Sequence, residues 1–224
     1  MFLGKDNMHD GQLEITNWEL LSKHFLEERL HQYLLAGKQS KPCAIRLFIW
    51  NSKTSAAIWE VIGYVEVSIR TVVDKQLRTE NALEDWLINF NVFAPNDPLW
   101  KVVAIARTRV GKTSKMPTHS QILQQLPLGF FQTLLSKRYL RVWPMLAGGF
   151  TGGTRSSQKE LSAAMFKLRK FRNRVGHHDL LVDDDLVQEF NNILRIAELI
   201  DPEFRRWLTK VSDVSGAIDS RPAC

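Results

Sequence analysis

The chain has 224 residues, 44% of them hydrophobic, and a formal net charge of +6. Seven tryptophans and twelve phenylalanines exclude a disordered polyelectrolyte, and the length is enough for one domain with a buried core. The positive charge suits an anionic partner such as RNA, but the surplus is mild and is weak evidence by itself.

The cysteines and the apolar runs predict the cellular compartment. Cys43 and Cys224 are far apart in the sequence, which gives neither a disulfide framework nor a cysteine-based zinc site. No apolar run reaches the roughly 18 residues of a membrane span, and the first residues lack the apolar core of a secretory signal. We therefore expect a protein of the reducing cytoplasm, without membrane association; we also expect no metal and no cofactor, because the motif resemblance described below implies metal-independent chemistry.

Helical periodicity recurs along the chain, whereas alternation with a period of two is scarce. Helices are predicted over residues 18–36, 44–77, 121–146 (with an irregularity at 127–129), 157–176, 183–199 and from 202 onward. The pattern predicts an all-α fold, a bundle of six or so helices. We expect a flexible tail over 1–15, a single domain over 16–210 and a second tail over 211–224.

Three helix ends have recognisable signals. Ser157 and Glu160 match a capping box at a helix start. Asp201 followed by Pro202 matches an N-cap and first-turn proline. Gly176 is a plausible helix terminator, which would place His177 in the turn that follows.

Arg172 is the least expected residue of the predicted 157–176 helix, because its spacing places it on the apolar face. That face consists of Leu161, Met165, Leu168 and Val175. Burying an unpaired guanidinium costs several kcal/mol, so Arg172 needs a partner. The partner is either a structural carboxylate or a phosphate bound in a cleft lined by this face. On a continuous helix Arg172 and His177 would point about 140° apart, so they converge only if the helix breaks or two subunits share a site.

Arg172 and Asn173, followed after three residues by His177 and His178, resemble the RNxxxHH motif of the Abi-like (abortive infection) HEPN family. Further blocks resemble the family in the same order, from about Leu21 to Trp207. They include Trp50-Asn51, Trp59-Glu60-Val61, residues 65–70, residues 126–131, Tyr139, Trp143 and 200–202. The resemblance implies a HEPN-like helical bundle with additional helices.

The resemblance also implies a function and a catalytic set. Members are metal-independent endoribonucleases that act as toxins or in phage defence, as homodimers with paired motifs. His177 would be the general acid/base, Arg172 would stabilise the phosphate and Asn173 would position it. RNA supplies the 2′-OH nucleophile, so the product would carry a 2′,3′-cyclic phosphate. The antitoxin could be protein or RNA.

The chain departs from the family at two positions. Asp179 stands where many members have a tyrosine that is adenylylated, which argues against that mode of control. Thr71 follows Arg70 where an asparagine is usual. Glu66 and Arg70 form either an exposed i,i+4 pair or, with His178, a supporting shell for the motif.

The remaining motifs leave two alternatives open. Lys167, Lys170 and Arg174 belong to a basic run that is either a solvated face or an RNA-binding track. Gly111-Lys112-Thr113 lacks the earlier glycine of a P-loop. The alternative to an enzyme is a catalytically silent HEPN module that binds RNA or a partner protein, or a helical scaffold in which Arg172 and Glu66 simply pair.

Overall fold

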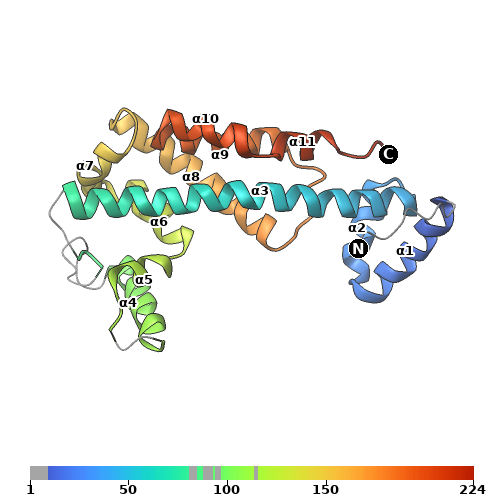
Figure 1. Ribbon diagram of the computed structural model, residues 1–224, viewed down its shortest axis with the longest axis horizontal. Coiled ribbons are helices and arrows are strands. Elements are labelled where there is room, and N and C mark those ends of the chain that lie inside the picture. Colours follow the sequence, from blue (N-terminus) through green and yellow to red (C-terminus); the bar gives the residue numbers. More distant parts are fainter. Residues whose placement is uncertain (1–9, 81–84, 88–92, 94–96, 114–115) are drawn as a thin grey trace, which may run out of the picture. The chain divides into compact units, whose positions relative to one another are not determined.

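The computed structural model describes residues 10–80, 85–87, 93, 97–113 and 116–224, and within them it confirms the all-α class (Figure 1). No strand occurs in these residues. The helices are α1 (Asp10–His24), α2 (Glu27–Ala36), α3 (Lys41–Lys75), α4 (Pro98–Gly111), α5 (His119–Gln124), α6 (Leu128–Leu134), α7 (Trp143–Leu146), α8 (Arg155–Gly176), α9 (Leu186–Ile200), α10 (Pro202–Val211) and α11 (Val214–Asp219). Short π- and 3₁₀-helical turns lie at Gln76–Glu80, Lys137–Val142 and Ala147–Gly149.

Several predicted boundaries differ from the observed ones. The helix predicted over 18–36 is two helices, because Leu26 adopts extended backbone angles and α2 restarts with Glu27 and Glu28 in its first turn. The predicted N-terminal tail lies outside the described residues up to residue 9, and α1 begins at Asp10. The segment predicted as a C-terminal tail contains α11.

Helix α8 begins two residues before the predicted start at Ser157. The side-chain oxygen of Thr154 accepts a hydrogen bond from the backbone N–H of Ser157 at 3.1 Å. Thr154 is therefore the N-cap, and Ser157 is the third residue of the helix. The Asp201 cap of α10 is as predicted, with its carboxylate accepting from Glu203 N–H at 2.7 Å and Pro202 at the first position.

The described residues fall into two compact units. The first unit contains residues up to Trp59, Arg174–Val187 and Asp213–Cys224. The second contains Glu60–Asn173 and Gln188–Ser212. Helix α3 has 35 residues and is about 50 Å long, so different segments of the chain pack on its two halves.

In the first unit, the end of the chain is fixed to the first half of α3. Cys224 forms a disulfide with Cys43, their Cα atoms 5.9 Å apart. The indole of Trp50 donates to the carbonyl of Ala217 at 2.8 Å, and the hydroxyl of Thr54 donates to the same oxygen at 3.3 Å. The expectation that these cysteines form no disulfide is therefore wrong, because the fold brings together two residues that are 181 positions apart in the sequence.

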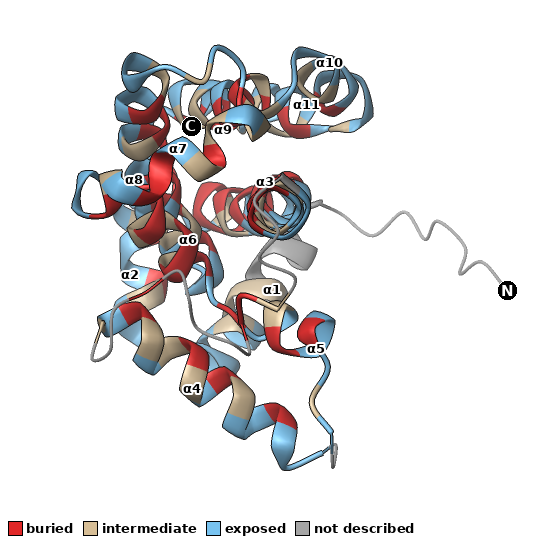
Figure 2. Ribbon diagram, turned by 90° about the vertical axis from the view of Figure 1, so that its left-hand side faces the viewer, coloured by how far each residue is buried: buried red, intermediate tan, exposed pale blue. Residues whose placement is uncertain are grey.

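In the second unit, the buried residues follow one face of each long helix (Figure 2). On α3 they are Val61, Val65, Ile69 and Val73, all 0% exposed. On α8 they include Leu161, Met165 and Leu168, which confirms the predicted apolar stripe. The core of this unit therefore lies where these faces pack.

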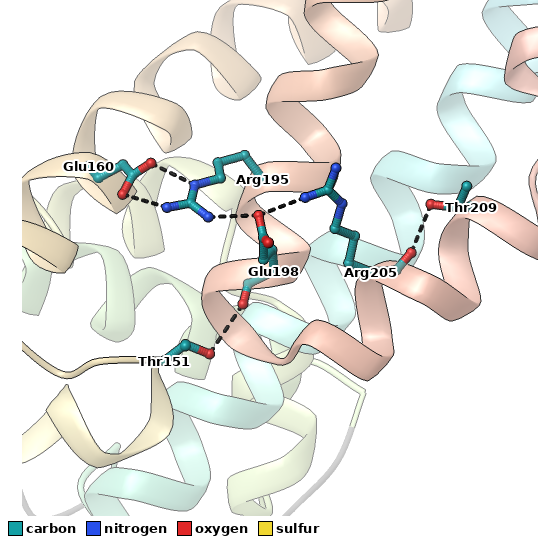
Figure 3. Close-up of polar contacts among 6 residues, drawn as sticks. All are labelled: Thr151, Glu160, Arg195, Glu198, Arg205 and Thr209. Atoms are coloured by element: carbon teal, nitrogen blue, oxygen red, sulfur yellow. Dashed lines mark hydrogen bonds and ion pairs between the residues drawn. The ribbon is translucent and has the colours of Figure 1, made fainter.

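An ion-pair network on the surface of the second unit joins α8, α9 and α10 (Figure 3). Arg195 binds both carboxylate oxygens of Glu160, at 2.6 and 2.9 Å, and one oxygen of Glu198 at 2.6 Å. Arg205 contacts the same Glu198 oxygen at 2.8 Å. Hydrogen bonds from Arg195 lower the pKa values of Glu160 and Glu198, so both stay ionised. The network links the exposed faces of the three helices.

A bilayer-spanning helix would need a long apolar stretch, and none of the helices in the described ranges has one.

Candidate functional site

The RNxxxHH motif lies at the end of α8, and the boundary between the two units passes through it. Arg172 and Asn173 belong to the second unit, whereas His177 and His178 belong to the first. Each half of the motif has its own environment within its unit.

The helix ends at Gly176, as predicted, and His177 and His178 form the turn. His178, not the glycine, adopts the left-handed conformation (φ 57°) that closes the helix. Its N–H binds the carbonyl of Val175 at 3.0 Å, and Asp179 N–H binds the carbonyl of Arg174 at 2.9 Å. This is a Schellman cap, in which the left-handed position is usually glycine. A non-glycine residue in that region is strained and needs support from its surroundings.

Asn51 supports this turn from α3, and sequence reasoning did not assign it a role. It is 3% exposed. Its side-chain oxygen accepts from Leu181 N–H at 2.8 Å, and its amide donates to the carbonyl of Asp179 at 3.2 Å. Arg29 also donates to the backbone oxygen of His178. The sequence signals were a polar residue among the buried positions of a helix and the place of Asn51 in a block that resembles the family.

Arg172, in the second unit, is paired with Glu66 of α3. The distance from Arg172 Nε to Glu66 Oε1 is 3.1 Å, and Arg70 Nη2 lies 3.4 Å from the other oxygen. Glu66 is 13% exposed and Arg172 36%. One carboxylate therefore holds two guanidiniums, which brings together three of the residues that the sequence singled out.

These residues line a cavity of about 560 Å³. Asn173 also lines it, and so do Arg169, which belongs to the predicted basic run, and Arg138, which sequence reasoning missed. The cavity thus has four arginines against one glutamate. Arg70 Nε is buried and has no hydrogen-bond partner within the described part of the chain. Such a donor surplus in a concave site favours a bound anion.

Of the three predicted RNA-binding cations, two are exposed on the helix surface and one is held in contacts within the protein. Lys167 and Lys170 are exposed on α8, and the Lys170 ammonium lies 4.7 Å from the ring centroid of Phe166. Arg174 forms an ion pair with Asp184 and donates to the carbonyl of Leu180 at 2.8 Å. Arg174 therefore stabilises the segment after α8, and its removal would disturb the turn as well as any RNA contact.

Among the described residues, no three His, Cys, Asp or Glu side chains are grouped so that they could hold a metal ion. No known family profile, curated protein or solved structure matches the chain. Assignment of the chain to the Abi-like HEPN family is accordingly a proposal.

Replacing Asn51 tests its support of the turn. Asn51→Ala leaves the buried N–H of Leu181 without an acceptor, so we expect the free energy of unfolding to fall by about 1–3 kcal/mol in urea titrations. Hydrogen exchange at the Leu181 amide should accelerate. The control is Lys53→Ala, an exposed position two residues along the same helix. Equal stability of the two variants, with unchanged exchange at Leu181, would contradict this role.

Proposed function

We propose that this chain is a metal-independent endoribonuclease of the Abi-like HEPN type, acting as a toxin or phage-defence effector. The observation that supports it best is the arginine-rich cavity in which Glu66 holds Arg172 beside Asn173. The motif resemblance assigns the catalytic roles, and the cavity supplies a physical reason for them.

The cavity argues for a phosphate site over a simple structural ion pair. An ion pair with a purely structural role needs only one cation for each carboxylate. Arg172 already supplies that cation to Glu66. Three further arginines line the same space, at positions 70, 138 and 169. Guanidiniums bind the oxygens of a phosphate in a planar, two-pronged geometry. Glu66 would then orient Arg172 without neutralising the cavity.

The proposed reaction needs only the substrate, a guanidinium and an imidazole. His177 removes the proton from the 2′-OH, and the 2′ oxygen forms a bond to phosphorus. The bond from phosphorus to the 5′ oxygen breaks, and that oxygen takes a proton from a second, protonated histidine, which the other motif of the proposed homodimer supplies. Arg172 stabilises the charge that builds on the phosphate oxygens, and Asn173 positions the phosphate. The product ends in a 2′,3′-cyclic phosphate.

The assembly that we propose is a homodimer in which two motifs share one cleft, so that one histidine can accept a proton while another donates one. Light scattering at micromolar concentration should give twice the 25.8 kDa chain mass. A strictly monomeric protein that cleaves RNA at the same concentration would contradict it. A protein or RNA antitoxin belongs to the same proposal. The expected cytoplasmic location rested on unpaired cysteines, and the disulfide between Cys43 and Cys224 removes that support.

His177→Ala separates the enzyme from a catalytically silent RNA-binding module. A general acid/base is needed for bond breaking, whereas affinity for the backbone comes mainly from cations. We expect His177→Ala to abolish RNA cleavage and growth arrest in bacteria while leaving RNA affinity nearly unchanged.

The matched control is Lys167→Ala/Lys170→Ala, which removes two exposed cations from α8 and keeps the turn intact. It should weaken RNA binding and flatten its salt dependence by about 0.7 units per lost phosphate contact. Equal growth arrest by the wild type and His177→Ala would show that the toxicity is not ribonuclease activity.

A further inference from the structure

The first unit has a second cavity, of about 470 Å³, beside the turn that carries the motif histidines. His178 lines it together with residues from the start of α2 and from α3. No step of the proposed reaction uses this cavity. Its size and largely apolar lining are those of a small-molecule or nucleobase site.

Three aromatic rings form the cavity's apolar surface. The ring centroids of Phe25 and Phe48 are 4.9 Å apart, and those of Tyr33 and Phe48 are 5.2 Å apart, both edge to face. Phe25 is 41% exposed and Leu26 beside it is 75% exposed. An exposed ring at the mouth of a cavity is a surface on which a planar group can stack.

One lining residue, Ser55, has a buried hydroxyl that lacks a partner in the described part of the chain. Ser55 is 5% exposed, and its oxygen has no hydrogen-bond partner among the described residues. Leaving a buried hydroxyl unpaired is unfavourable, so it marks a position where a ligand's polar edge would fit. A group with a flat apolar face and a polar edge could both stack on the exposed ring and hydrogen-bond to the Ser55 hydroxyl.

Arg29 adds a positive charge to the rim. It is exposed, donates to the backbone oxygen of His178 and hydrogen-bonds to Tyr33. None of the described residues that line this cavity is acidic. A phosphate attached to the planar group would therefore meet a cation next to the aromatic site.

We propose that this cavity binds an unpaired nucleobase of a single-stranded RNA, stacked on Phe25 and hydrogen-bonded at its edge by Ser55, with the adjoining phosphate at Arg29. The inference rests on the proposed function, since it takes RNA as the ligand. Because His177 immediately precedes His178, the cavity would select the base next to the cleaved bond. Single-stranded RNA is commonly recognised through bases splayed onto aromatic side chains.

The test uses the full-length protein and a short 2′-O-methyl oligonucleotide, which lacks the attacking hydroxyl and so cannot be cut. Fluorescence anisotropy compares this oligonucleotide with one that is abasic throughout. Phe25→Ala should weaken binding of the intact oligonucleotide at least about fivefold and leave binding of the abasic one unchanged. Leu35→Ala, an exposed apolar residue of α2 outside the cavity, is the control and should change neither.

Ser55→Ala gives a readout that a purely structural role would not. Removing an unpaired buried hydroxyl should keep or raise the melting temperature, yet weaken binding of the intact oligonucleotide. Loss of stability with unchanged binding would overturn the inference. A nucleoside monophosphate that binds as tightly as the oligonucleotide would also overturn it, because the occupant would then be a free nucleotide.

The outcomes separate the two proposals. If the wild type cleaves RNA but neither Phe25→Ala nor Ser55→Ala changes binding, the result contradicts the proposed base site and leaves the proposed ribonuclease intact. If binding depends on the bases but unmodified RNA is not cleaved, the result contradicts the proposed ribonuclease activity and supports the base site. A protein that binds no oligonucleotide contradicts both.

Discussion

The pairing of Arg172 with Glu66 is the constraint on which the candidate site depends. Arg172 lies on the same helix face as the buried Leu168 but is 36% exposed, and a partly buried guanidinium there needs a carboxylate from the helix opposite. Glu66 meets this requirement from α3 and takes Arg70 as well. In the second unit, the packing of α8 on α3 thus fixes the position of the motif arginine.

The motif histidines depend on a different set of contacts. His178 closes α8 in a left-handed conformation, and the turn is supported by Asn51 and Arg29 through backbone atoms. Backbone hydrogen bonds hold the turn in place and leave the imidazoles of His177 and His178 exposed. Exposed imidazoles on a well-supported turn suit a proton-transfer role. The same support places His178 at the edge of the aromatic cavity.

What could be predicted from the sequence was local or imposed by burial. Periodicity identified the all-α class, and the Asp201-Pro202 cap was evident because the signal lies in adjacent residues. The need of Arg172 for a partner followed from the cost of burying charge, whereas Glu66 was a candidate because it borders the apolar stripe of its helix and because of the family resemblance. The choice of Thr154 over Ser157 as a cap was not predictable, because both can accept the same kind of hydrogen bond.

Contacts between segments that are distant along the chain could not be predicted from the sequence. The bond from Asn51 to Leu181 and the disulfide of Cys43 with Cys224 join residues 130 and 181 positions apart. Arg138 and Arg169 occupy sequence positions that are typical of exposed helix residues. Only the fold shows that they line the same cavity as Arg172. The two-unit division likewise follows from the length of α3, on whose halves different segments pack.

We propose that this chain cleaves RNA by means of the RNA's own 2′-OH, and that protein side chains catalyse the reaction without a metal ion. The most direct measurement incubates purified protein with single-stranded RNA in excess EDTA, and with the same RNA carrying a 2′-deoxy sugar at the cleaved position. The account predicts cleavage of the first to a 2′,3′-cyclic phosphate and none of the second at that position. Cleavage that stops with EDTA and returns with a divalent ion, or that proceeds at the deoxy position, would contradict it.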